Sequence, residues 1–95
     1  MEILWSPQSL RDLEAIHEYI ARDSSHYADV TVARIFAGVE RLMHFPESGR
    51  MVPERNEPEI REIIVGRFRV VYRFRRSKIE IATVFRASRE FPGGL

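Results

Sequence analysis

Apolar residues recur every three or four positions in two stretches of the first half of the chain, which is the spacing of amphipathic helices. The first stretch follows Ser6 and Pro7, a favourable helix start because serine caps the first turn and proline fits its first position. We expect this helix to end near residues 23–25, and a second helix to begin directly afterwards and run to about Phe45. The short connection between them predicts an antiparallel helical hairpin.

Most of the remaining chain alternates apolar and polar residues in the manner of strands. A further short strand is expected at residues 2–5, at an edge of the sheet. Residues 46–59 hold three prolines and several charges, which predicts a connecting loop after the second helix. Short links make an antiparallel meander of the last three predicted strands, at residues 60–65, 68–75 and 79–85.

The order strand, helix, helix and three strands predicts an α+β fold, with the helical hairpin packed on one face of a small antiparallel sheet. A chain of 95 residues is the size of one compact domain, so residues 1–95 are expected to fold as a single unit. In the strand at 68–75, alternate residues point towards the helices, and the opposite face of the sheet is expected to stay open. The residues that point towards the helices are Phe68, Val70, Tyr72 and Phe74.

The composition limits the kinds of functional site that the chain can form. The chain has no cysteine, which excludes disulfides and thiolate metal sites and fits the cytoplasm. His17, His26 and His44 show no ligand-like pairing, so we expect no metal ion and no cofactor. The N-terminal residues do not resemble a signal peptide, and no stretch approaches the ~18 apolar residues of a membrane span.

The net charge of +1 hides an uneven distribution along the chain. Residues 1–60 hold six arginines against eleven acidic residues, a net charge of −5. Residues 61–95 hold nine basic residues against three acidic ones, a net charge of +6. A basic second half indicates an anionic partner.

Arginines alternate along the strand at 68–75, and we expect them to project from its open face in a row with steps of about 6–7 Å. Guanidinium groups bind phosphates and carboxylates in a forked geometry, which favours nucleic acid or an acidic protein segment as the partner. The alternative is that this row is only the solvated side of a half-exposed sheet. The predicted binding surface, including neighbouring strands, comprises Arg61, Arg67, Arg69, Arg73, Arg75, Arg86 and Arg89.

Catalytic motifs are scarce, since no phosphate-binding loop, dinucleotide fingerprint or nucleophile motif occurs. Glu54, in the loop, is a candidate general base, although a solvated charge or an ion-pair partner for a neighbouring arginine describes it better.

Several short stretches, spread over almost the whole chain, carry a family resemblance. They are Trp5-Ser6 before Asp12-Leu13, Tyr19-Ile20-Ala21, GRMVPE at 49–54, Ile60-Arg61-Glu62, GRFRVVYR at 66–73 and RASREFP at 86–92. Together they resemble the RelE/ParE toxins of bacterial toxin–antitoxin modules. The resemblance implies a helical hairpin on a small antiparallel sheet. It also implies a cognate antitoxin, ParD-like or similar, that forms a hetero-oligomer with the toxin.

This family divides by target, because RelE-like members cut messenger RNA on the ribosome whereas ParE-like members poison DNA gyrase. RNA cleavage needs a base, an acid and cations for the phosphate. Many members have histidine where this chain has Arg86, which stays protonated and is a poor base, and Lys78 is the only lysine. The VPE loop and the RASREFP ending are closer to ParE-like members. The resemblance therefore implies a gyrase poison that is not a hydrolytic enzyme.

Two other interpretations stay open. An mRNA endoribonuclease would use Glu54, Arg61 and Arg86 as a minimal catalytic set, with the ribosome supplying further groups. An inactive homologue would act only as a binding protein. We further expect the antitoxin to cover apolar surface by adding a helix, or by adding a strand to an open edge at residues 2–5 or at the last strand.

Overall fold

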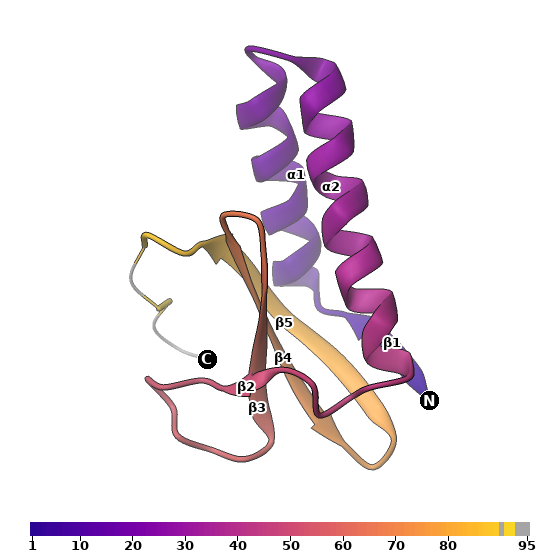
Figure 1. The fold of residues 1–95 in the computed structure, drawn as a ribbon. Coiled ribbons are helices and arrows are strands. Elements are labelled where there is room, and N and C mark those ends of the chain that lie inside the picture. The colour runs from indigo at the N-terminus through magenta and orange to yellow at the C-terminus, as the bar shows by residue number, and fades with distance from the viewer. Residues whose placement is uncertain (90, 93–95) are drawn as a thin grey trace.

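A computed structural model describes residues 1–89 and 91–92. Two helices lie side by side against one face of a five-stranded sheet with the strand order β1-β5-β4-β3-β2 (Figure 1). This arrangement confirms the predicted α+β fold with a helical hairpin on one face of a sheet. The elements are β1 (Glu2–Trp5), α1 (Pro7–Ala21), α2 (Ser25–Glu40), the 3-10 turn η1 (Arg41–Met43), β2 (Arg50–Met51), β3 (Ile60–Val65), β4 (Phe68–Arg75) and β5 (Lys78–Arg86).

Serine side chains start both helices. The Ser6 hydroxyl accepts a hydrogen bond from the Ser9 amide at 3.0 Å, and the Ser24 hydroxyl accepts one from the Tyr27 amide at 3.1 Å. These caps satisfy amides that have no partner within the helix. α2 ends at Glu40 and tightens into η1, so the prediction of a helix to about Phe45 was too long. Pro46 keeps Phe45 out of the helix, since a residue before proline is disfavoured in the helical conformation, but it does not explain why the α-helix ends as early as Glu40.

The sheet is mixed, whereas an antiparallel sheet was expected. β1 runs parallel to β5, with Ile3 opposite Ile79 and Trp5 opposite Ile81. β1 is an edge strand, as predicted, and it pairs only with residues 78–81 of β5, so the later part of β5 has no strand beside it on that side. The predicted loop contains the two-residue strand β2, which pairs antiparallel with the start of β3 and leaves the later part of β3 at the sheet edge.

The main core lies between the helical hairpin and the sheet. Tyr72 is fully buried there, as the alternation in β4 predicted. Burial of these side chains removes apolar surface from water, which is the main driving force for the packing of the two layers. The buried members of this core are Leu13, Ile35, Val39, Leu42, Phe68, Val70, Tyr72, Ile79, Ile81 and Val84.

The opposite face of the sheet, called the back face from here on, is not open. Val71 points to this face and joins a second buried cluster with Val52, Ile60 and Phe85, against which Phe91 packs. The loop at 46–59 brings Val52 across the sheet, where it is 0% exposed. The prediction of an open face was therefore wrong, because the loop and the end of the chain supply apolar side chains that cover it.

Candidate functional site

Arg69, at the centre of the predicted arginine row, is buried on the back face and is only 7% exposed. Its Nη1 and Nη2 atoms donate to the two carboxylate oxygens of Glu54 at 3.0 and 2.8 Å. Its Nε donates to Glu62 at 2.6 Å, and Glu62 also accepts a hydrogen bond from Arg50. Two carboxylates therefore neutralise this guanidinium, so Arg69 has no exposed face to offer an anionic partner.

The same pairing fixes the charge of Glu54. The hydrogen bonds from Arg69, together with a backbone hydrogen bond, lower the pKa of the Glu54 carboxyl to about 2. The pKa of Arg69 is raised in turn, first by its hydrogen bond to Glu54. Glu54 is thus an ion-pair partner of an arginine, the structural role that the sequence favoured over that of a general base.

Arg61 holds the loop at 46–59 instead of lining an open surface. Its Nε donates to the carbonyl oxygen of Pro58 at 3.2 Å and its Nη1 to that of Gly49 at 3.0 Å. Tyr72 also holds this loop, because its hydroxyl donates to the carbonyl oxygen of Pro46 at 2.8 Å and accepts from the Gly49 amide at 3.1 Å. Burial raises the pKa of the Tyr72 hydroxyl above its usual value.

The rest of the predicted row is dispersed. The bulge between β4 and β5 places the extra residue, Ala82, in β5, so β4 keeps its alternation. Arg73 is half-buried opposite Glu80, and Arg75 is exposed opposite Lys78 at the far end of the strand. The covering loop and the burial of Arg69 thus divide a row that looked continuous in the sequence.

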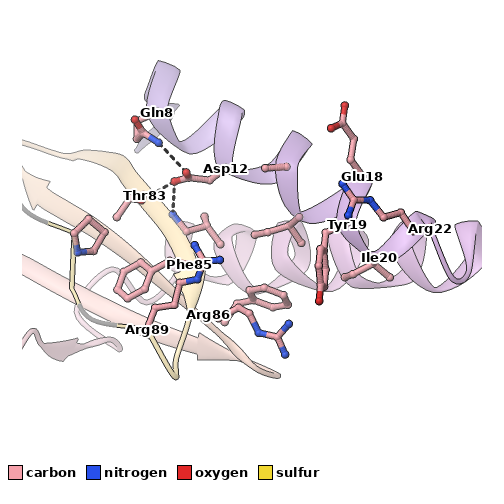
Figure 2. A pocket seen from close by; sticks show the side chains of 15 residues that line it. Gln8, Asp12, Glu18, Tyr19, Ile20, Arg22, Thr83, Phe85, Arg86 and Arg89 are labelled. Carbon is pink, nitrogen blue, oxygen red and sulfur yellow. Dashed lines mark hydrogen bonds between the residues drawn. The ribbon is translucent and has the colours of Figure 1, made fainter.

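The structure gathers a different set of arginines in a groove between the helical hairpin and the end of β5 (Figure 2). Two adjoining hollows of about 860 and 420 Å³ make up this groove. The hollows share Tyr19, Ile20, Phe68 and Arg86. Arginines that line the groove come from five segments of the chain, and they are Arg22, Arg34, Arg67, Arg86 and Arg89.

The groove combines positive charge with apolar and aromatic surface. Its lining contains five arginines and three acidic residues, Asp12, Glu18 and Asp23. Tyr19 is 60% exposed, and the guanidinium of Arg22 lies 5.8 Å from the centre of its ring. Among the described residues, the guanidinium groups of Arg67, Arg86 and Arg89 make no hydrogen bond or ion pair. Their donors are therefore available to a partner that carries carboxylates or phosphates.

Asp12 has a structural role in this groove. Its Oδ2 accepts hydrogen bonds from the Thr83 hydroxyl at 2.6 Å and from the Val84 amide at 2.9 Å, while Oδ1 accepts from Gln8 at 2.8 Å (Figure 2). These bonds tie α1 to β5 beside the bulge and leave this carboxylate fully engaged. Asp12 thus fixes one wall of the groove in place.

The sequence located only part of the groove. It predicted Arg67, Arg86 and Arg89 as binding residues from the basic second half of the chain, and all three line the groove. It missed Arg22 and Arg34, which lie in the acidic first half and reach the groove only because the hairpin packs on the sheet. No local pattern in the sequence marks these two arginines.

The proposed ribonuclease set is not assembled in this structure. The carboxylate of Glu54 lies on the back face with Arg69, whereas Arg61 pairs with Tyr72 and Arg86 pairs with Phe68. Tyr72 lies four positions after Phe68 in β4, which places Arg61 and Arg86 about 13 Å apart along the strand direction, with β4 between their strands. Glu54, Arg61 and Arg86 therefore do not share a site.

Other candidate sites are few in the part of the chain that the structure describes. His17 contacts Asp29 at 2.8 Å across the helical hairpin, on the outer surface. Residues 1–89 and 91–92 contain no group of three histidines or carboxylates that could hold a metal ion. None of the described helices has both the length and the apolar character needed to cross a membrane.

Known proteins of similar sequence and fold are named as toxins or as parts of toxin–antitoxin systems. A family model described as the ParE toxin of the type II toxin–antitoxin system parDE matches residues 3–91. A Sinorhizobium fredii protein, Y4kP, whose name marks it as a candidate toxin, is 35% identical over 91 residues, which is 95% of this chain and 92% of Y4kP. A solved structure of the chromosomal ParDE toxin–antitoxin system from P. aeruginosa has a similar fold. Its TM-score is 0.75 at 24% identity, over 90% of this chain and 95% of that one. The chain belongs to the ParE toxin family of type II toxin–antitoxin systems.

Proposed function

We propose that this protein is a cytoplasmic toxin that inhibits DNA gyrase by binding to it, without cutting RNA, and that a ParD-like antitoxin neutralises it. The observation that carries this proposal is the ion pair of Glu54 with Arg69. The only carboxylate of the candidate ribonuclease set is the forked partner of Arg69, with a pKa of about 2. A carboxylate with so low a pKa is a weak base at neutral pH.

Neither arginine of that set replaces this base. Arg61 donates to loop carbonyl oxygens, and a guanidinium group such as that of Arg86 is a donor and not an acceptor. The Tyr72 hydroxyl donates to the Pro46 carbonyl oxygen inside the fold. The groove itself offers cations and apolar surface, which suit binding.

The groove also suits the proposed antitoxin. Its five arginines and its apolar residues match a segment that carries acidic residues on one side and apolar residues on the other. Such a segment would place carboxylates against Arg67, Arg86 and Arg89 and cover Tyr19 and Ile20. We propose that the toxin and antitoxin form a hetero-oligomer in this way, so that neutralisation and inhibition of gyrase compete for the same arginines.

The experiment uses the purified protein with gyrase, supercoiled DNA and ATP, and measures trapped, cleaved DNA. The same preparation enters a translating extract in which the length of the message is followed. Cleaved DNA with intact message supports the proposal. Cut message with unaffected gyrase contradicts it and favours a ribosome-dependent endoribonuclease. No effect in either assay leaves the inactive homologue as the explanation.

A further inference from the structure

The contacts of Arg69 reach beyond its two carboxylates. Glu54 and Glu62 occupy the edges of the guanidinium, and two aromatic rings approach the same group. The guanidinium carbon lies 5.0 Å from the centre of the Phe85 ring and 5.6 Å from that of the Phe91 ring. The two rings meet edge to face, with centres 5.8 Å apart and planes at 86°. Phe91, close to the end of the chain, is therefore held by a cation and a ring.

The chain reaches this position through a turn after β5. The Ala87 amide donates to the carbonyl oxygen of Arg67 at 2.8 Å, and the Arg89 amide donates to that of Arg86 at 2.9 Å. The turn brings Phe91 against the back-face cluster, while Arg89 and Pro92 line the groove. One short segment thus contributes to both the back face and the groove.

We propose that Arg69 is a positioning residue for the groove: by holding Phe91, it seats the segment formed by residues 87–89 and 91–92, and so places Arg89 and Pro92 in the groove wall. Arg69 itself touches no partner. Glu54 and Glu62 contribute indirectly, because their hydrogen bonds fix the plane of the guanidinium against which Phe91 packs. The link to binding rests on the proposed function, whereas the seating of the segment does not.

The physical reason is conformational entropy. Ordering residues that lie outside helices and strands costs conformational entropy, which specific contacts must offset. Here the described contacts are two amide hydrogen bonds, the cation–π contact and the packing of Phe91. If Phe91 is released, a partner must order this segment on binding, and that cost lowers its affinity.

The seating can be measured through the two hydrogen-bonded amides. Hydrogen exchange at Ala87 and Arg89, followed by NMR, is compared for the wild type and for Phe91→Ala, Phe91→Leu and Phe91→Tyr. Leucine keeps the apolar contact but has no aromatic face, whereas tyrosine keeps both. We expect exchange at both amides to be roughly fivefold faster or more in the alanine and leucine variants, and close to wild type in the tyrosine variant.

The control is the Ser9 amide, which donates to the Ser6 hydroxyl at 3.0 Å at the start of α1 and reports on the fold away from this segment. Its exchange is expected to be the same in all four proteins. Full protection of Ala87 and Arg89 in Phe91→Leu would show that apolar packing alone holds the segment, and would overturn the role of Arg69. Unchanged exchange in Phe91→Ala would overturn the seating altogether.

A second measurement connects seating to binding. The concentration of protein that half-inhibits gyrase is expected to rise by roughly fivefold in Phe91→Leu and to stay near the wild-type value in Phe91→Tyr. Faster amide exchange without a change in inhibition would overturn the positioning role. If the wild-type protein leaves gyrase unaffected, the proposed function fails, whereas the exchange result still decides how the segment is held.

Discussion

The back face and the groove use the same side chain in opposite ways. Arg69 and Arg86 lie on neighbouring strands, and the pairing of β4 with β5 sets Arg69 opposite Phe85 and Phe68 opposite Arg86. Arg69 is buried and bonded to Glu54 and Glu62. Arg86 lines the groove and makes no hydrogen bond to another described side chain. Neighbouring positions in a basic stretch can therefore have opposite roles, one structural and one available for binding.

Solvation explains the difference. A buried charge is tolerated only when it is paired and hydrogen-bonded, and Arg69 satisfies this condition within its own chain. An arginine at the rim of a groove stays hydrated until a partner with carboxylates or phosphates replaces the water. A basic segment thus indicates a binding surface only through those of its residues that are not neutralised by carboxylates of the same chain.

The largest effect is expected from Arg69→Met, which removes the cation and leaves the fully buried carboxylate of Glu62 beside it. Removal of one partner of a buried ion pair costs about 3–5 kcal/mol of unfolding free energy. The matched variant Arg86→Met should change this free energy by no more than about 0.5 kcal/mol. Urea unfolding measures both, and similar values for the two variants would contradict the distinction between the two regions.

A second effect concerns the loop that covers the back face. A Cβ atom at Gly49 would lie 2.5 Å from the Tyr72 hydroxyl and 2.7 Å from the carbonyl oxygen of Glu62. Gly49→Ala should therefore lower the free energy of unfolding by about 1–3 kcal/mol, because it forces the loop away from the sheet. Thermal unfolding tests this, and a stability equal to that of the wild type would show that the loop is not held by this close approach.

In the groove, the double variant Arg86→Glu, Arg89→Glu should weaken binding without loss of stability. Reversal of two charges should raise the concentration needed to inhibit gyrase by roughly 10- to 100-fold. Arg41→Glu is the matched control, since Arg41 is exposed on η1 and away from the residues that line the groove. Equal losses in the double variant and the control would indicate a general effect of charge instead of a defined surface.

The smallest effect is expected on stability when Glu54 is protonated at low pH. Because the pKa of Glu54 is lowered in the folded protein, its ion pair stabilises the fold above the ordinary pKa of 4.5 and is lost as the pH falls towards 2. The difference in melting temperature between the wild type and Glu54→Gln should therefore be present at neutral pH and should narrow as the solution approaches pH 2. A difference that stays constant over this range would show that Glu54 acts through packing and not through its charge.

The elements themselves could be predicted from the sequence with few errors. Apolar spacing located both helices, and β3 and β4 begin and end at the predicted residues. The edge position of β1 was predicted, but its parallel pairing with β5 was not, because a four-residue apolar run pairs equally well in either direction until the helical hairpin brings it beside β5. The two-residue strand β2 was missed because its pairing with β3 depends on Arg61 and Tyr72, which are distant in sequence and hold the loop at 46–59.

The sequence by itself determined the family, the two-layer fold and the basic character of the second half, because periodicity, charge and short motifs are local properties of the chain. Only the tertiary structure decided which arginines are neutralised and which are available. Ion pairs such as Arg69 with Glu54 join residues from separate segments, and the same holds for the approach of Arg22 and Arg34 to the groove. The energy of a charge depends on its neighbours and its exposure to water, and both are properties of the packed molecule.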